Sequence, residues 1–135
     1  MTMTDKKSKG KHSVLIVEDE NMLNEAYQVI LSSAGYTVLT AFDGKEALEL
    51  LAKEKVDVIL LDLRMPVLDG IGFLEAYQLR EQKNPPKVVV FSNFDMQKEI
   101  DQAYELGADK YMLKAWASPK ELLQLITNIL NEKKS

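Results

Sequence analysis

One stretch of sequence decides the fold of this 135-residue chain: Val58-Ile59-Leu60-Leu61-Asp62-Leu63-Arg64-Met65-Pro66-Val67-Leu68-Asp69-Gly70. Residues 58–61 are continuously apolar, which is typical of a parallel strand buried on both faces. The strand runs into the carboxylate of Asp62, and residues 65–70 have the composition of a loop. Parallel α/β sheets bind ligands just beyond the carboxyl ends of their strands. The stretch therefore predicts an α/β protein with Asp62 at its binding edge.

Three further apolar segments end in polar residues in the same way. Residues 13–17 run into Glu18 and Asp19, residues 87–91 run into Ser92, and residues 111–113 run into Lys114. If all four strands lie parallel in one sheet, three carboxylates, a hydroxyl and an ammonium group meet in one shallow pocket. Such a pocket suits a magnesium-dependent phosphoryl acceptor with Asp62 as its nucleophile.

Segments with an apolar repeat of 3.6 residues lie between these strands. Helices are expected at about 23–34, 43–53, 71–82, 95–107 and 118–131, and a further short strand at 36–40. Asp43, Asp95 and Ser118 are placed to cap three of these helices, and Asp69 to serve the turn before another. Five strands alternating with five helices predict an α/β fold of the (βα)5 type.

The alternating elements occupy residues 13–131, which are therefore expected to form a single domain. Residues 1–12 are polar and Lys-rich and are expected to be a flexible basic tail, and residues 132–135 a short C-terminal tail. The predicted domain carries eleven Lys and Arg against nineteen Asp and Glu, a net charge of −8. Because binding to nucleic acid needs clustered cations, no nucleic-acid partner is expected for this domain.

The composition also limits the class of protein. Hydrophobic residues make up 46% of the chain and charged residues 28%, as in an ordinary globular domain. No apolar segment approaches the roughly 20 residues needed to cross a bilayer, and the polar start is unlike a signal peptide. There is no cysteine, hence no disulfide and no thiolate metal site. We expect a cytoplasmic protein with no membrane partner.

The residues at the strand ends, in this order and at these spacings, resemble those of the response regulator receiver domain of the CheY-like superfamily. In addition, residues 62–70 match the D-x-x-M-P-x-x-D-G pattern of that family. The resemblance covers residues 13–131. It implies a flavodoxin-like fold, in which helices cover both faces of a five-stranded parallel sheet with strand order 2-1-3-4-5.

The resemblance also implies a function in two-component phosphorelay signalling. Asp62 is then the acceptor of a phosphoryl group from a sensor histidine kinase or a histidine phosphotransfer protein. Mg²⁺ is the implied cofactor, and its implied ligands are Glu18 (through a water molecule), Asp19, Asp62 and the backbone carbonyl of Arg64. Lys114 is expected to bind a phosphoryl oxygen. Ser92 and Tyr111 are the implied switch residues, which reshape a surface read by an unknown downstream protein. The domain is not expected to be an enzyme beyond its own phosphorylation and dephosphorylation.

Other functions remain open from the sequence. The chain could be a receiver-like interaction module that works without phosphorylation. A phosphatase of the haloacid-dehalogenase kind is disfavoured, because the second acid that it needs is replaced by Arg64. A flavodoxin-like cofactor binder is disfavoured, since no phosphate-binding loop rich in Ser, Thr and Gly follows the first strand.

Three positions need the structure for their interpretation. Asp57 is a rival acceptor in sequence only, because five strand residues place it about 16–17 Å from Asp62, at the opposite edge of the sheet. Ala115 follows Lys114 where the family usually has a proline, so the geometry of that peptide bond is open. Asn93 follows Ser92 where the family commonly has a smaller residue.

Overall fold

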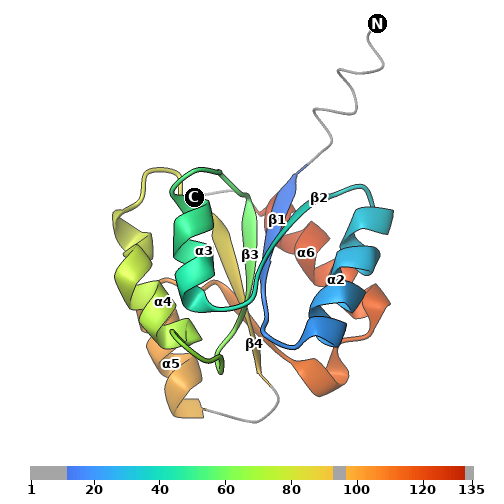
Figure 1. Cartoon of the computed structure of the whole chain (residues 1–135). Coiled ribbons are helices and arrows are strands. Elements are labelled where there is room, and N and C mark those ends of the chain that lie inside the picture. The colour runs from blue at the N-terminus through green and yellow to red at the C-terminus, as the bar shows by residue number, and fades with distance from the viewer. Residues whose placement is uncertain (1–11, 93–96, 133–135) are drawn as a thin grey trace, which may run out of the picture.

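The computed structural model describes residues 12–92 and 97–132 (Figure 1). Residues 1–11 and 133–135 of the predicted tails at 1–12 and 132–135, the residue Asn93 and the helix cap predicted at Asp95 lie outside the described residues. Five strands form one parallel sheet in the order β2-β1-β3-β4-β5, as predicted. The strands are β1 (Ser13–Val17), β2 (Thr37–Ala41), β3 (Val58–Asp62), β4 (Lys87–Ser92) and β5 (Lys110–Leu113).

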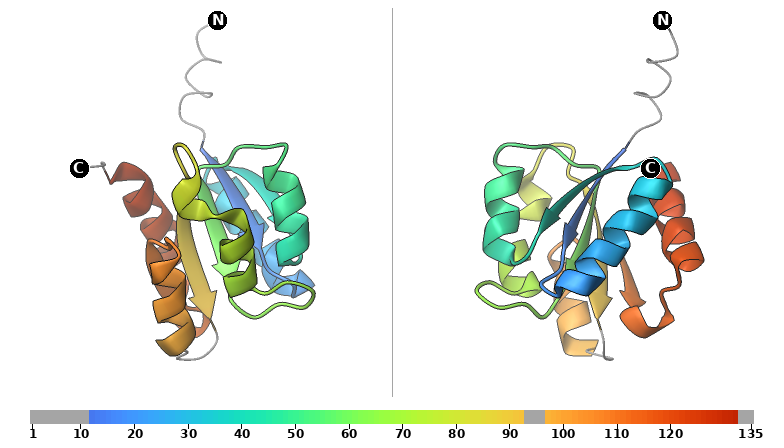
Figure 2. Two further views of the ribbon diagram at one scale, coloured as in Figure 1. Left: turned by 90° about the vertical axis from the view of Figure 1, so that its left-hand side faces the viewer. Right: turned by 45° about the vertical axis from the view of Figure 1, so that its right-hand side comes forward.

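Helices connect the strands and cover both faces of the sheet (Figure 2). They are α2 (Asn21–Ser33), α3 (Gly44–Leu51), α4 (Gly70–Tyr77), α5 (Gln97–Glu105) and α6 (Pro119–Asn131), with 3-10 turns η1 (Leu79–Glu81) and η2 (Lys114–Trp116). The predicted flavodoxin-like α/β fold is confirmed. Among the described residues, no helix has both the length and the apolarity that a membrane crossing requires.

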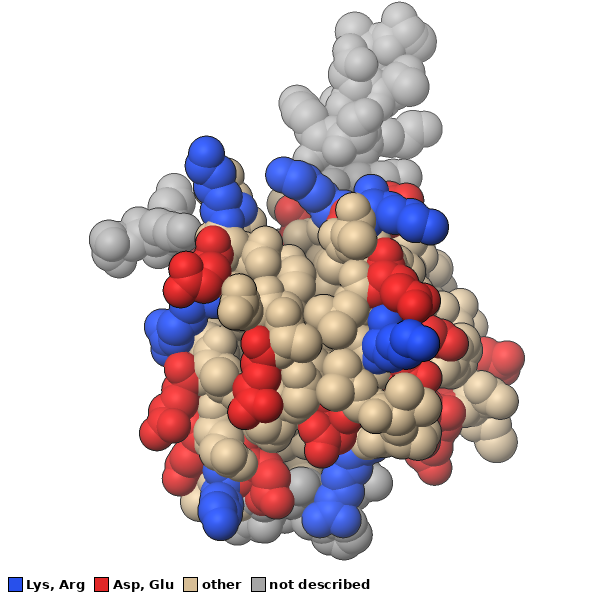
Figure 3. Space-filling view, turned by 60° about the vertical axis from the view of Figure 1, so that its left-hand side comes forward, with Lys and Arg blue, Asp and Glu red and all other residues tan. Residues whose placement is uncertain are grey.

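The side chains of each central strand point alternately to two separate cores, as the period of two in a strand requires. Val58 and Leu60 of β3 pack on the side of α2 and α6, with Tyr27 and Ile126. The other core contains Ile59, Leu61 and Phe73 and lies under α3, α4 and α5. On that covered face the acidic and basic side chains are interspersed (Figure 3). Burial on both faces explains why the strand sequences are continuously apolar.

Helix caps lie where the sequence places them. Asp43 Oδ1 accepts a hydrogen bond of 2.8 Å from the backbone N–H of Glu46 at the start of α3. Ser118 Oγ accepts one of 3.1 Å from Glu121 at the start of α6. Asp69 Oδ1 accepts one of 2.8 Å from Gly72 at the start of α4. Each side chain satisfies an N–H group that has no partner within its own helix.

The α4 helix is shorter than its predicted extent to about Gln82. It ends at Tyr77 because Gln78 adopts a left-handed backbone with φ 54°, which stops the regular hydrogen bonding. The chain continues as the η1 turn before it enters β4. The periodicity of apolar residues does not mark this end, because Leu79 continues the apolar pattern from within the 3-10 turn.

Candidate metal site at the carboxyl ends of the strands

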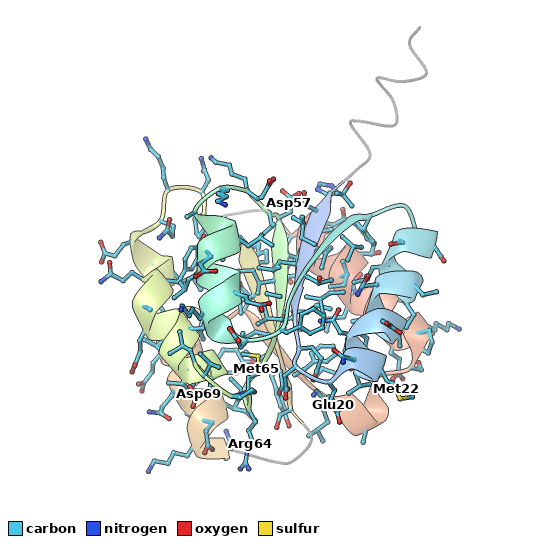
Figure 4. All side chains as sticks on the ribbon, in the orientation of Figure 1. Glu20, Met22, Asp57, Arg64, Met65 and Asp69 are labelled. Carbon is cyan, nitrogen blue, oxygen red and sulfur yellow. The ribbon has the colours of Figure 1, made fainter. Side chains whose placement is uncertain are left out.

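The sheet brings together three charged side chains from β1, β3 and the end of β5. The Lys114 ammonium lies 2.6 Å from Glu18 Oε1 and 3.1 Å from Asp62 Oδ2. All three side chains are almost completely buried. Figure 4 shows the labelled residues Glu20 and Arg64 near this end of the sheet, with Asp57 at the opposite end.

Backbone N–H groups hold the carboxylates of Glu18 and Asp62 in place. Asp62 Oδ1 accepts a hydrogen bond of 3.2 Å from the backbone N–H of Arg64. Glu18 Oε2 accepts one of 3.1 Å from the backbone N–H of Glu20. Each carboxylate therefore has one oxygen on a backbone donor and the other on Lys114, which leaves the pair little rotational freedom.

Asp19 completes an acidic cluster that fits a hard divalent cation. Glu18, Asp19 and Asp62 each offer one oxygen, and these oxygens lie within 4.8 Å of one another. Mg²⁺ takes oxygen ligands at about 2.0–2.1 Å, so the oxygens need only small side-chain rotations to reach a common ion. The donor set contains carboxylate oxygen alone, which suits Mg²⁺ better than a softer metal.

The electrostatics of the cluster favour an added cation. Burial raises the pKa of Glu18 and that of Asp62, and the negative charge of Asp62 adds to the shift at Glu18. Burial lowers the pKa of the Lys114 ammonium, but its contacts with Glu18 and Asp62 outweigh that effect and the pKa is raised overall. The cluster of three carboxylates thus has one ammonium group, bound to two of them, in a partly desolvated pocket, where a divalent cation reduces the repulsion between the carboxylates.

The two predicted switch residues lie in β4 and β5 at different depths. Ser92 is the buried last residue of β4, and its register partner in β5 is Leu113, the residue before Lys114. Tyr111 is half-buried in β5 and packs against the core under α3, α4 and α5. Tyr111 therefore lies on the opposite side of the sheet from the core that Glu18 and Asp62 extend.

The loop after β5 has an ordinary backbone at the position where the sequence departs from the family pattern. All peptide bonds of the described residues are trans, including the one between Lys114 and Ala115. Residues Lys114–Trp116 form the η2 turn directly after β5. A cis bond before a residue other than proline costs about 3–4 kcal/mol, which accounts for the trans form here.

Gly70 allows the loop after β3 to fold back on the acceptor strand. Its backbone N–H donates a hydrogen bond of 3.1 Å to the carbonyl of Leu63. A Cβ atom at this position would lie 2.7 Å from the carbonyl oxygen of Asp62 and 2.8 Å from Cα of Leu63. Both are backbone atoms of the site, so only glycine fits without moving Asp62.

Asn24 is a residue of the site that the sequence reasoning missed. Its side chain is fully buried, and its Nδ2 donates a hydrogen bond of 3.0 Å to the backbone carbonyl of Glu18. Gln28 Nε2 in turn donates one of 2.8 Å to Asn24 Oδ1 and fixes the orientation of the amide. The available signal was a polar residue on the buried face of α2, one helical turn before Tyr27 and two before Leu31.

Comparisons with known proteins agree with this geometry. Residues 14–127 match the family model described as response regulator receiver domain. The chain is 37% identical over 130 residues to the probable transcriptional regulator ycf27 of Cyanidium caldarium, covering 96% of this chain and 51% of that protein. The chain thus spans about half the length of the curated relatives that it matches.

Two solved structures have the same fold. The receiver domain of a Francisella response regulator superposes with a TM-score of 0.76 at 34% identity, covering 88% of this chain and 95% of that one. The receiver domain of a sensor histidine kinase from Pseudomonas aeruginosa gives a TM-score of 0.79 at 25% identity, covering 91% and 100%. That structure holds a magnesium ion in its active-site cleft.

The family model covers most of the chain, and the structural neighbours share the fold that carries the acidic cluster and its lysine. On these grounds the chain belongs to the response regulator receiver domain family.

Proposed function

We propose that Asp62 accepts a phosphoryl group from a phosphohistidine of a sensor histidine kinase or a histidine phosphotransfer protein, in a Mg²⁺-dependent reaction. One observation carries the proposal: a single buried ammonium, Lys114, contacts both Asp62 and Glu18 inside an acidic cluster. Lys114 pairs with two carboxylates and Asp19 adds a third to the cluster, so the excess negative charge favours the uptake of a further cation.

The residues of the site have different roles in such a transfer. An oxygen of the Asp62 carboxylate forms the bond to phosphorus while the phosphorus–nitrogen bond breaks, and the electron pair of that bond stays with the imidazole nitrogen. Asp62 and the phosphoryl group both carry negative charge, so cations must offset their repulsion in the transition state. Lys114 supplies one of these cations, since its ammonium already lies 3.1 Å from Asp62 Oδ2.

Glu18, Asp19, Asp62 and the backbone carbonyl of Arg64 would hold Mg²⁺. The bound ion would neutralise charge on the phosphoryl oxygens. The chain's own contribution is to hold the carboxylates in place through the backbone N–H groups of Glu20 and Arg64. We further propose that the domain has no separate substrate and catalyses only its own phosphorylation and dephosphorylation.

The phosphorylated domain would signal by a change of surface. New acceptor oxygens on Asp62 would draw in the hydroxyl of Ser92, which ends the neighbouring strand β4. Tyr111, half-buried in β5, would then turn inward and reshape the surface beside α5 for a downstream protein. Several relatives that this chain resembles are described as transcriptional regulators, which supports a signalling role.

Incubation with acetyl phosphate tests the acceptor. Wild type with Mg²⁺ should gain the mass of one phosphoryl group, and Asp62→Asn should not. Asp57→Asn is the matched control, because Asp57 is bound to the backbone N–H of Ser13 at the other end of the sheet and should leave phosphorylation intact. Equal phosphorylation of Asp62→Asn would overturn the assignment. No phosphorylation of wild type would favour the interaction module that works without phosphate.

A further inference from the structure

The connection between β2 and α3 contacts two parts of the acidic site, although it carries none of the predicted site residues. At one end, the carbonyl of Ala41 accepts a hydrogen bond of 3.1 Å from the backbone N–H of Glu18. At the other end, the backbone N–H of Gly44 donates one of 3.0 Å to the carbonyl of Leu68, in the loop between β3 and α4. The connection therefore links the end of β1 to the loop that follows the acceptor strand.

Gly44 and Leu68 lie too close together for any side chain at position 44. A Cβ atom on Gly44 would lie 2.5 Å from the carbonyl oxygen of Leu68 and 3.1 Å from its Cβ. The φ angle of Gly44 lies outside the left-handed region, so the backbone itself would accept alanine. The close approach of the two segments, and not the backbone angle, is what requires glycine here.

An added side chain at this position would displace the loop more readily than the helix. The start of α3 is held by two reciprocal hydrogen bonds, because Asp43 Oδ1 accepts one of 2.8 Å from the N–H of Glu46 and Glu46 Oε1 accepts one of 2.8 Å from the N–H of Phe42. Ala47 of the same helix is fully buried in the core. Most of residues 64–68 are exposed, by contrast, so little packing opposes a shift of the loop.

The loop carries one of the groups proposed to hold the metal ion. That group is the backbone carbonyl of Arg64, whose N–H is bound to Asp62 Oδ1 at 3.2 Å. Only three residues separate Arg64 from Leu68, and the hydrogen bond of 2.7 Å from Leu68 N–H to the Pro66 carbonyl ties them into a tight turn. A shift of Leu68 is therefore expected to move Arg64 as well. Mg²⁺ demands near-ideal octahedral geometry and tolerates such a shift poorly.

We propose that Gly44 is a positioning residue of the metal site, which allows the β2–α3 connection to hold the loop after β3 where the Arg64 carbonyl can reach the ion. The proposal rests on the Mg²⁺-dependent function proposed above, and it adds a support from a connection that carries none of the ligands. The affinity for Mg²⁺ then depends on the space at position 44, whereas a glycine that only begins a helix has no such effect.

Calorimetric titration with Mg²⁺ alone tests the proposal. Gly44→Ala should bind Mg²⁺ about tenfold more weakly than wild type, the lower end of the loss found when a group behind a metal ligand is changed. Gly72→Ala is the matched control, because its Cβ would meet the same residue 2.7 Å away, but at Leu68 Cδ1, the end of a flexible side chain. That methyl group can turn aside, so Gly72→Ala should bind like wild type. Wild-type affinity in Gly44→Ala, or equal weakening in both variants, would overturn the proposal.

Amide hydrogen exchange of the wild-type protein gives a second test, which applies even if Gly44→Ala does not fold. Coupling between two contacts is reciprocal, so bound Mg²⁺ should strengthen the hydrogen bond between Gly44 and Leu68 by the same factor. Exchange of the Gly44 N–H should therefore slow about tenfold at saturating Mg²⁺. The control is the Gly107 N–H, which is bound to the Tyr104 carbonyl at 3.0 Å after α5 and should not change.

An unchanged Gly44 amide, or equal slowing at the two glycines, would overturn the proposal while leaving the function of Asp62 intact. A wild-type protein that takes up no Mg²⁺ is a different outcome, since it would overturn the Mg²⁺-dependent function proposed for Asp62 and this inference with it.

Discussion

The Lys114 ammonium lies 2.6 Å from Glu18 Oε1, nearer than its 3.1 Å to Oδ2 of the acceptor Asp62. The lysine is therefore bound more closely to Glu18, at the end of β1, than to Asp62, at the end of β3. Glutamate has one methylene group more than aspartate, and this extra length helps Glu18 to reach across to Lys114. The pair links the end of β1 to the end of β5, two strands that are not neighbours in the sheet.

Replacing Lys114 should lower the stability of the domain, because the buried carboxylates lose their ion pairs. We expect Lys114→Met to lower the free energy of unfolding by about 3 kcal/mol without metal, because Glu18 and Asp62 lose their common partner. Mg²⁺ should recover much of this loss, since a ligand bound only by the folded state stabilises it. Urea denaturation with and without Mg²⁺ measures both effects.

Lys110→Met is the matched control for this substitution. Lys110 pairs with Glu132 at 3.5 Å, but both side chains are nearly half exposed. Exposed ion pairs contribute at most about 1 kcal/mol, so this variant should unfold almost like wild type at any Mg²⁺ concentration. Equal losses in the two variants would show that Lys114 does not hold a desolvated acidic cluster.

Asn24 should matter to stability more than its polar character suggests. Asn24→Leu has nearly the same volume but leaves the buried carbonyl of Glu18 without its side-chain donor. We expect a loss of about 1–3 kcal/mol in the free energy of unfolding. The affinity for Mg²⁺ should also be weaker, because the backbone of Glu18 loses the hydrogen bond from Asn24. Thermal denaturation and calorimetric titration with Mg²⁺ measure these quantities.

Gln28→Leu serves as the comparison for Asn24→Leu. Gln28 donates a hydrogen bond to the Asn24 amide and is partly exposed, so water can replace that hydrogen bond. The expected loss is less than about 1 kcal/mol, with little change in Mg²⁺ affinity. A Gln28 variant that loses as much as Asn24→Leu would contradict the role given to the Glu18 carbonyl.

Val67 has a strained backbone in the loop between β3 and α4. It has φ 69°, it is 74% exposed, and the N–H of Leu68 donates a hydrogen bond of 2.7 Å to the carbonyl of Pro66 around it. This is a γ-turn, and a left-handed conformation is unfavourable for a β-branched residue. Val67→Asn should stabilise the domain by about 1 kcal/mol, because asparagine tolerates this conformation better.

Val29 offers the control for that gain. It is 65% exposed, but it lies in the regular helix α2, where valine and asparagine have similar propensities. Val29→Asn should therefore change the denaturation midpoint very little. A stabilisation of the same size at both positions would point to removal of exposed apolar surface instead of relief of strain.

The stabilisation given by Mg²⁺ should depend on pH with a defined sign. Burial raises the pKa of Glu18 above its ordinary 4.5 and that of Asp62 above its ordinary 3.8. A carboxyl group whose pKa is raised by folding stabilises the fold below its ordinary pKa, and this contribution is lost as the pH rises through the raised value. The ionised carboxylates are also the forms that bind a metal.

The shift in Tm on adding Mg²⁺ should therefore be small at about pH 4 and grow toward neutral pH. Differential scanning calorimetry over this range, with and without Mg²⁺, measures it. In Glu18→Gln one of the two titrating groups is absent, so the growth with pH should be smaller. A Mg²⁺-dependent shift that is equal at acid and neutral pH would mean that the ion binds elsewhere.

The sequence by itself determined the order of the elements and the residues that stand at the strand ends. Continuous apolar runs such as 58–61 mark parallel strands, because a sheet covered by helices on both faces leaves no polar side. Once the strands are parallel, their carboxyl ends share one edge, so Glu18, Asp62 and Lys114 must lie near one another. The local caps at Asp43 and Ser118 follow from contacts within three residues.

The tertiary structure alone decided the distances and contacts between distant parts of the chain. The close pairing of Lys114 with Glu18 joins strand ends that are remote in sequence, and the hydrogen bond from Asn24 to the Glu18 carbonyl depends on how α2 packs on the sheet. Apolar periodicity predicts neither contact, and it does not mark the end of α4. Periodicity reports which face of an element is buried, whereas the atoms that meet there depend on how the helices pack on the sheet.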